Sequence, residues 1–224
     1  MTAKKAALVA GASGLVGGHV VQHLLASPHY GEVIVVTRRE LALEHPKLRQ
    51  ILIPLDDMES FLAEAHVKAD DAFCALGTTI KVAGSQAAFR KVDHDYVVAF
   101  ARAAKAAGAA RFMLVTAIGA SSASKIFYSR VKGETEEAVA AVGFDALHIF
   151  RPGLLLGARG ERRAAESLMM TISPLLNPLM LGPAAVYKSI DADVVAAAMV
   201  AAAARDERGR KVHTYGEMVT LAGR

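Results

Sequence analysis

The feature that most restricts the fold is a set of three evenly spaced glycines directly after the first apolar run. Residues 6–11, AALVAG, form a continuous apolar run that is typical of a strand buried on both faces. Gly11, Gly14 and Gly17 recur at every third position, and an amphipathic stretch, GGHVVQHLLAS (17–27), follows. A buried strand, a glycine turn and a helix in this order predict the first unit of a parallel α/β sheet.

Short apolar runs and amphipathic stretches alternate along the rest of the chain. No linker, charge run or internal repeat divides it, so we expect one domain over residues 1–224. The alternation predicts an α/β fold with a single Rossmann-like, doubly wound parallel sheet and helices on both of its faces. The remaining expected strands are 32–38, 49–55, 71–77, 111–117, 146–152 and 211–216; the expected helices are 95–108, closed by Gly108, then 133–143 with a start near Tyr128, and one capped by Asp191.

The glycine turn has the composition of a phosphate-binding loop. Its spacing, G-x-x-G-x-x-G, differs by one position from the basic dinucleotide fingerprint, but its glycines would equally let the backbone approach a pyrophosphate at a helix N-terminus. A glycine-rich turn without a ligand is the alternative. The cofactor-binding residues predicted here are Gly11, Ala12, Ser13, Gly14, Leu15, Val16 and Gly17.

The residues after the second predicted strand favour NADP(H) over NAD(H). NAD binders usually place an acid here for the ribose hydroxyls, whereas NADP binders place an arginine nearby. At this strand end the chain has Thr37, Arg38 and Arg39, and no acidic residue follows until Glu40. A guanidinium binds a phosphate through two hydrogen bonds, so Arg38 and Arg39 are predicted to bind the 2′-phosphate. Two solvated arginines at a strand end are the alternative.

Four longer segments carry a resemblance to a known family. They are GASGLVGGHVV, CALGTTIKVAGSQAAFRKVDHDYV, FMLVTAIGASSASKIFYSRVKGETEEAV and IFRPGLLLGARGERR, and together they cover roughly residues 6–165. On these segments the chain resembles an atypical short-chain dehydrogenase/reductase. It is more narrowly similar to the Tat-interacting-protein-like branch of NADPH-binding oxidoreductases. The resemblance implies NADPH bound along the carboxyl ends of the strands and a tyrosine–lysine catalytic pair.

Tyr128 matches the catalytic tyrosine of that family, and Lys132 matches its lysine. A separation of four residues puts both side chains on one face of a helix, one turn apart. There the ammonium would stabilise a phenolate and also bind the nicotinamide ribose, so Lys132 is both a catalytic and a cofactor-binding candidate. A core tyrosine beside a surface lysine is the alternative.

The third catalytic member departs from the family pattern. Many relatives carry two successive hydroxyl residues after the fifth strand, but here Thr116 is followed by Ala117. We expect Thr116 to hydrogen-bond the substrate carbonyl and stabilise the developing oxyanion. Ser121 and Ser122 are the other candidates.

Further cofactor-binding residues are expected at other strand ends. Leu76, Gly77 and Thr78 end the fourth strand, where the middle of the cofactor would pass; a plain strand-ending turn is the alternative. Asp56 resembles the family's adenine-side acid, but a helix N-cap explains it equally well. Pro152 and Gly153, which follow Arg151 after the sixth strand, would line the nicotinamide end, unless Pro152 only terminates the strand.

Residues from about 154 to 190 are expected to form the lid on the substrate side. Their segment 167–187 is rich in Met, Leu and Pro, a composition that would suit a lid, a dimer interface or, most simply, core packing. His148 reads as a hydrogen-bonded strand histidine. Arg159, Arg162 and Arg163 form a basic cluster that would clamp a phosphate or an acidic substrate, although a solvated cluster is the commoner explanation.

Composition excludes several other classes of protein. The single cysteine, Cys74, permits no internal disulfide and lies in an apolar run, which indicates a core residue in a reducing compartment. The longest apolar run, 194–204, is too short to span a bilayer. A net charge of +4 with scattered basic residues gives no sign of nucleic-acid binding, and no Cys/His or paired-carboxylate spacing suggests a metal. We expect a cytoplasmic protein, monomeric or homodimeric, with no membrane or nucleic-acid partner.

Taken together, the motifs predict an NADP(H)-dependent oxidoreductase that acts on a small, apolar carbonyl or alcohol of unknown identity. A cofactor-binding regulator without turnover is the alternative. A sugar-nucleotide epimerase is disfavoured, because it needs a larger C-terminal substrate region than this chain provides.

Overall fold

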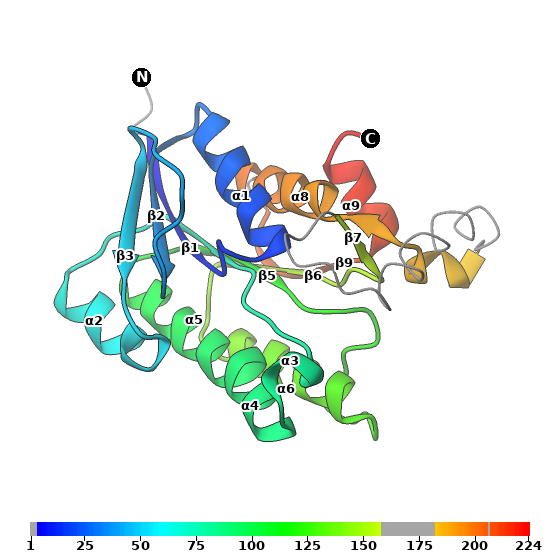
Figure 1. Ribbon diagram of the computed structural model, residues 1–224. Helices are drawn as coiled ribbons and strands as arrows, with labels where there is room; N and C mark the ends of the chain where they lie inside the picture. Colours follow the sequence, from blue (N-terminus) through cyan, green and yellow to red (C-terminus); the bar gives the residue numbers. More distant parts are fainter. Residues whose placement is uncertain (1–3, 158–181, 206) are drawn as a thin grey trace.

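Seven parallel strands form the centre of the protein (Figure 1). The computed structural model describes residues 4–157, 182–205 and 207–224. The strand order is β3-β2-β1-β4-β5-β6-β9, and every neighbouring pair is parallel. The predicted doubly wound, Rossmann-like sheet is confirmed. The strands are β1 (Lys5–Ala10), β2 (Tyr30–Thr37), β3 (Leu48–Leu52), β4 (Asp71–Cys74), β5 (Arg111–Val115), β6 (Ala146–Phe150) and β9 (Gly209–His213).

Helices cover both faces of this sheet (Figure 1). One face is covered by α1 (Leu15–Ala26), α8 (Ala192–Ala204) and α9 (Tyr215–Leu221), and the other by α2 (Met58–Glu64), α5 (Tyr96–Ala106) and α6 (Phe127–Ala140). Two short helices, α3 (Ile80–Ala83) and α4 (Gln86–Arg90), and a π-helical segment, Lys91–Asp95, lead into α5. A separate pair, β7 (Leu155–Leu156) and β8 (Ile190–Asp191), and two 3-10 turns, Leu55–Asp57 and Gly182–Tyr187, complete the described elements.

The two-sided burial explains why the strands are continuous apolar runs. In β1, Leu8 packs into the core under α5, while its neighbour Val9 packs into the core under α1 and α8. Cys74 is buried in the first of these cores, and burial raises the pKa of its thiol to about 12. It is a core residue, as predicted.

Most predicted elements are present, with shifted ends. Gly108 follows α5 with φ +98°, and Asp191 caps α8 by accepting a hydrogen bond from the Asp193 N–H at 2.9 Å, both as predicted. The strand predicted over 71–77 ends at Cys74, because the next residues leave the sheet as a loop.

The last predicted strand, 211–216, was placed too late: β9 ends at His213. Thr214 and Glu217 then form a capping box that starts α9 at Tyr215. The T-x-x-E spacing was the sequence signal for this helix. Among the described residues, no helix is both long and apolar enough to cross a bilayer.

Candidate functional site

The glycine loop between β1 and α1 is shaped by close backbone contacts. A Cβ on Gly11, whose φ is +87°, would lie 2.5 Å from the Ala75 carbonyl, and one on Gly17 would lie 2.1 Å from the Gly11 oxygen. No residue with a side chain fits at either position without displacing backbone. Gly14 is less crowded and precedes α1 with no side-chain cap, so the first N–H groups of this helix are left for a ligand.

The other residues of this loop divide into two kinds. Ala12 and Val16 are buried against α8 and the sheet, so they would offer a ligand only their backbone. Ser13 is exposed and Leu15 is half-buried. The open face of the loop is therefore made by Ser13, Gly14 and Leu15, which fits a phosphate-bearing ligand held by backbone groups.

Arg38 and Arg39 lie beside this loop, at the end of the neighbouring strand. β1 and β2 are paired with Ala10 opposite Val36, so the segments after both strands lie at the same edge of the sheet. The Thr37 hydroxyl donates to the Arg39 carbonyl at 2.7 Å and shapes the turn. Both arginines are exposed, and neither guanidinium has an ion-pair partner within the described ranges.

The segment after β4 lies over a buried ion pair. The Lys132 ammonium is 2.7 Å from Asp93 Oδ1, with 7% of the lysine and 0% of the aspartate side chain exposed. The N–H of Thr78 donates to the other Asp93 oxygen at 2.8 Å. A Cβ on Gly77 would lie 3.3 Å from Asp93 Oδ1 and 3.7 Å from Lys132 Nζ, so this glycine keeps the space above the pair open. Leu76 is half-buried beside it.

Tyr128 and Lys132 lie one turn apart on α6. The Tyr128 ring packs against Phe89, with 5.5 Å between ring centroids, and remains partly exposed. Burial lowers the pKa of Lys132, but the charge and hydrogen bonding of Asp93 together with the nearby Tyr128 outweigh this, so that the pKa of the lysine is raised overall. A buried lysine held as a cation excludes the surface-lysine alternative, while the catalytic role of the pair stays a prediction.

Thr116 has a different partner from the predicted substrate carbonyl. Its hydroxyl donates to Glu136 Oε1 at 2.7 Å inside the protein. Glu136, which is 1% exposed, also accepts hydrogen bonds from Arg151 Nε at 2.9 Å and from Arg210 at 3.3 Å. Because its one hydrogen is used in this way, Thr116 does not offer a donor to a substrate here.

The two alternative serines follow in the next loop. The Ser122 hydroxyl donates to Glu137, whereas the Ser121 side chain is exposed and its hydroxyl has no hydrogen-bond partner among the described residues. The loop is tied to α6 because the Ser121 N–H donates to the Ser129 carbonyl at 3.0 Å. Of the two hydroxyls, that of Ser121 is therefore the one left available as a donor.

Two residues of this half of the site were not assigned from the sequence. Asp93 lies within one of the four segments that carry the family resemblance, but the sequence pattern alone gives it no role. Gly133 follows Lys132, and a Cβ on it would lie 2.1 Å from the Ser122 nitrogen, so only glycine lets the loop cross the helix at this point. A glycine in a helix interior costs stability, and that cost was the available signal for a close backbone approach.

Asp56 lies at the far edge of the site, after β3. It belongs to a 3-10 turn, Leu55–Asp57, and α2 starts beyond it, so the helix N-cap alternative is wrong. Its carboxylate is 2.7 Å from Lys91 Nζ. Hydrogen bonds from Lys91 and Tyr96 lower the pKa of Asp56. A contact with adenine stays a prediction.

Pro152 and Gly153 continue from β6 at the carboxyl edge of the sheet. The Pro152 carbonyl accepts a hydrogen bond from the Ile118 N–H at 2.9 Å, which joins the loops after β5 and β6. A Cβ on Gly153 would lie 2.7 Å from the Lys188 carbonyl oxygen, so glycine permits this close approach. Arg159, Arg162, Arg163 and residues 158–181 of the predicted lid lie outside the described residues.

His148 lies away from this site, under α8 and α9. Its Nδ1 is 2.9 Å from Nε2 of His213, and the two rings stack with centroids 5.2 Å apart. The pair is buried, and burial lowers the pKa of His213 to about 4. His148 is thus a buried strand residue whose Nδ1 is hydrogen-bonded, as predicted, but its Nε2 has no hydrogen-bond partner among the described residues. Within the described part of the chain, no group of three or more His, Cys, Asp or Glu side chains could hold a metal ion.

Comparisons with known proteins agree with the assignment of the glycine loop to a nucleotide-binding fold. Residues 11–168 match the family model described as NAD(P)H-binding. The chain is 34% identical over 204 residues to the mitochondrial protein fmp52 of Aspergillus niger, covering 89% of this chain and 87% of that protein. It is 36% identical over 167 residues to HTATIP2 of Rattus norvegicus, covering 73% and 68%.

Solved structures of low sequence identity share the fold. MoeE5 in complex with UDP-glucose and NAD superposes with a TM-score of 0.69 at 17% identity, over 97% of this chain and 80% of that one. The human epimerase family protein SDR39U1 with NADPH superposes with a TM-score of 0.63 at 20% identity, over 93% and 74%. These likenesses support the Rossmann-like fold.

Proposed function

The chain belongs to the NAD(P)H-binding, atypical short-chain dehydrogenase/reductase family, and from this premise we propose that it is an NADP(H)-dependent oxidoreductase. It transfers hydride to or from a small, apolar carbonyl or alcohol. The observation that carries the proposal is the buried, charged Lys132, placed one turn from Tyr128 and beneath the loop Leu76–Thr78.

The proposed roles follow from the chemistry of these side chains. The cofactor supplies or accepts the hydride when it is bound. Tyr128 donates a proton to the carbonyl oxygen in reduction and accepts one in oxidation. Lys132 keeps its charge through Asp93, and its ammonium has three hydrogens, so it serves the ribose hydroxyls while staying paired. The hydroxyl of Ser121 is our candidate for the second donor to the carbonyl.

The preference for NADP(H) rests on Arg38 and Arg39. Both guanidinium groups are exposed at the edge of the sheet that carries the glycine loop, and no acid stands at either position. A carboxylate there would repel a 2′-phosphate, whereas a guanidinium binds it. The structure of SDR39U1 was obtained with NADPH, which is compatible with this choice.

A second function is favoured by one observation. The Thr116 hydroxyl donates its hydrogen to Glu136, so the hydrogen-bond donor expected after β5 is already used. A protein that binds NADPH and signals its presence to a partner, without turnover, would not need that donor.

Among the relatives, the fungal fmp52 proteins carry the word mitochondrial in their names, so the cytoplasmic location of this chain stays a prediction.

The test measures oxidation of NADPH with a panel of small, apolar aldehydes and ketones. Tyr128→Phe should lower turnover by about a hundredfold or more, the size of a general-acid contribution, and leave NADPH affinity nearly unchanged. Tyr215→Phe, in α9, is the matched control and should keep full activity. Undiminished turnover in Tyr128→Phe would refute its role. Tight NADPH binding without turnover of any substrate would favour the regulator.

A further inference from the structure

The carboxylate of Glu136 is buried on α6, one turn beyond Lys132. Tyr128, Lys132 and Glu136 follow one another at intervals of four residues, so all three lie along one face of the helix. Glu136 is 1% exposed, and a buried carboxylate is stable only where charges and hydrogen bonds compensate it. Its distance along the helix from the proposed catalytic pair is set at one turn and two turns.

Three side chains from neighbouring strands surround this carboxylate. Thr116, just after β5, donates to Glu136 Oε1 at 2.7 Å. Arg151, just after β6, donates through Nε to the same oxygen at 2.9 Å and through a second nitrogen to Oε2. Arg210, in β9, donates at 3.3 Å. Because Arg151 and Glu136 are joined by two hydrogen bonds, both their distance and their relative orientation are fixed.

Thr116 and Arg151 are the first residues of two segments that run side by side beyond the sheet. We call these segments, 116–118 and 151–153, the β5/β6 shelf. The Thr116 N–H donates to the Phe150 carbonyl, and the Ile118 N–H donates to the Pro152 carbonyl, both at 2.9 Å. Because Glu136 binds the first residue of each segment, it sets where the shelf lies relative to α6.

The β5/β6 shelf lies where the nicotinamide is expected. Pro152 and Gly153 are its expected contacts, and Tyr128 and Lys132 belong to the helix that Glu136 joins to the shelf. Hydride transfer needs reacting atoms that are about 3–3.5 Å apart, and a displacement of about 1 Å costs about a hundredfold in rate. A residue that joins the shelf to α6 would therefore control the rate without contacting the reacting atoms.

We propose that Glu136 is a positioning residue, which holds the β5/β6 shelf at the distance from α6 that brings the nicotinamide ring and the substrate carbonyl to Tyr128. This inference rests on the proposed function, because it takes the shelf to be a surface of the nicotinamide site. Glu136 touches neither cofactor nor substrate in this account. It acts through Thr116 and Arg151.

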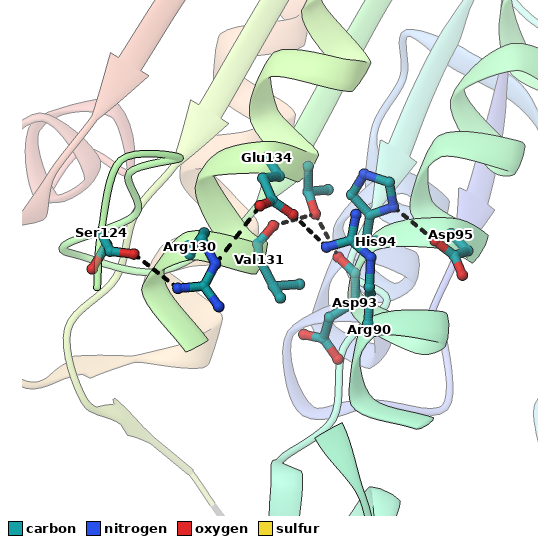
Figure 2. Close-up of polar contacts among 9 residues, drawn as sticks. Arg90, Asp93, His94, Asp95, Ser124, Arg130, Val131 and Glu134 are labelled. Atoms are coloured by element: carbon teal, nitrogen blue, oxygen red, sulfur yellow. Dashed lines mark hydrogen bonds and ion pairs between the residues drawn. The ribbon is translucent and has the colours of Figure 1, made fainter. Parts of the chain in front are cut away.

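Glu134, two residues earlier on α6, supplies a control for the loss of a carboxylate on this helix. Figure 2 shows Glu134 between Arg90, at the end of α4, and Arg130 of α6. The Glu134 side chain is 31% exposed, and both of these partners lie outside the β5/β6 shelf. Exposed ion pairs contribute little to stability, so Glu134→Gln should leave both folding and turnover unchanged.

The ion pair between Asp71 and Arg111 supplies a control for the loss of a buried pair. Asp71 is 0% exposed, and its carboxylate lies 2.5 Å from Arg111 Nε and accepts from the Tyr30 hydroxyl at 2.8 Å. Asp71 and Arg111 begin β4 and β5, so this pair lies at the opposite edge of the sheet from the shelf. Asp71→Asn should therefore destabilise the protein without displacing the nicotinamide.

The test is a single-turnover experiment, in which enzyme in excess over NADPH is mixed with a saturating carbonyl substrate. Glu136→Gln keeps the size of the side chain but removes its charge. Its rate constant for NADPH oxidation should fall about a hundredfold. The rate constants of Asp71→Asn and Glu134→Gln should stay within about twofold of wild type. A variant that is only less stable loses amplitude in this experiment, because fewer molecules are folded, and keeps its rate constant.

A binding measurement shows that the other half of the cofactor site is intact. The dissociation constant of adenosine 2′,5′-bisphosphate, which lacks the nicotinamide riboside, should change by less than about twofold in Glu136→Gln. An unchanged rate constant in Glu136→Gln would overturn the proposal. So would an equal fall in Asp71→Asn, or a loss of bisphosphate binding as large as the fall in rate.

A second variant is available if Glu136→Gln does not fold. Arg151→Lys keeps the positive charge but replaces a planar fork of donors with a single point charge, so the shelf loses its fixed orientation. A lowered rate constant is again expected, and an undiminished one again overturns the proposal. A wild-type protein that binds NADPH but turns over none of the carbonyl substrates would refute the proposed function, and this inference with it.

Discussion

The phosphate-binding half of the site and its catalytic half are held in shape by different forces. Around Gly11 and Gly17 the backbone is packed so tightly that no Cβ fits. Around Lys132 and Glu136, buried charges hold the elements together through ion pairs. In the first half the contacts lie within the loop and with Ala75, just after the neighbouring strand β4, whereas in the second Glu136 reaches Arg210, 74 positions away. Substitutions should therefore be destabilising through steric clashes in the phosphate-binding half and through lost ion pairs in the catalytic half.

The largest effect is expected at Gly17. Gly17→Ala would place a Cβ 2.1 Å from the Gly11 oxygen, so the loop must move. We expect a loss of roughly 4 kcal/mol or more in the free energy of unfolding, together with loss of NADPH binding. Gly18→Ala is the matched control, because its Cβ would make only an ordinary contact at 3.5 Å. Denaturant unfolding measures the stability of both variants, and equal stability of the two would contradict the steric account.

In the catalytic half, Glu136→Ala should be the most damaging change. It leaves Arg151 without its buried partner and frees the Thr116 hydroxyl. Breaking a buried ion pair by removing one partner costs about 3–5 kcal/mol, and we expect a loss of unfolding free energy in this range. The exposed neighbour Glu137, replaced by Ala, should cost less than about 1 kcal/mol. Comparable losses in both variants would show that the buried network adds little.

Acid should weaken the edge of the sheet that carries β9. The pKa of His213 is lowered by burial from 6.5 to about 4, so the unfolded chain binds the proton more readily than the folded one. This contribution to stability is complete above about pH 6.5, and it is lost progressively as the pH falls toward 4. The loss amounts to about 3 kcal/mol.

Unfolding curves measured between pH 7 and 4 test this dependence. His213→Gln should flatten the acid limb of the stability profile, whereas His29→Gln, at an exposed position, should leave it unchanged. An acid limb that is equally steep in His213→Gln would assign the effect to other groups.

The smallest effect is expected at the 2′-phosphate. The double change Arg38→Ala and Arg39→Ala removes the two exposed guanidinium groups and should weaken NADPH about tenfold, while NADH affinity stays the same. Arg49→Ala, an exposed arginine on β3 that pairs with Glu32, is the control. A titration with each nucleotide decides it, and an equal loss for NADH would mean that the arginines do not read the phosphate.

The same contrast explains what was predictable from the sequence. Apolar runs and the glycine triplet are local patterns with a direct physical meaning, so the sheet, α1 and the loop Gly11–Gly17 could be predicted. The ion pair between Asp93 and Lys132 joins two separate elements, and the sequence around neither residue indicates which side chain it pairs with. The sequence predicts a substrate contact for the Thr116 hydroxyl for the same reason, since nothing in it places Glu136 beside this residue.

The ends of elements were harder to predict than their existence. The segment after β4 continues as an apolar run, but its backbone leaves the sheet at Ala75 to pass over Asp93. The start of α9 was missed although its capping box, Thr214 and Glu217, is a local signal.

The most direct test of the central claim is a fluorescence titration of the wild-type protein with NADPH and, separately, with NADH. The account predicts saturable binding of NADPH that is about tenfold or more tighter than that of NADH, because only NADPH carries the phosphate that Arg38 and Arg39 would bind. Binding of neither nucleotide would contradict the account, since the glycine loop would then serve packing alone.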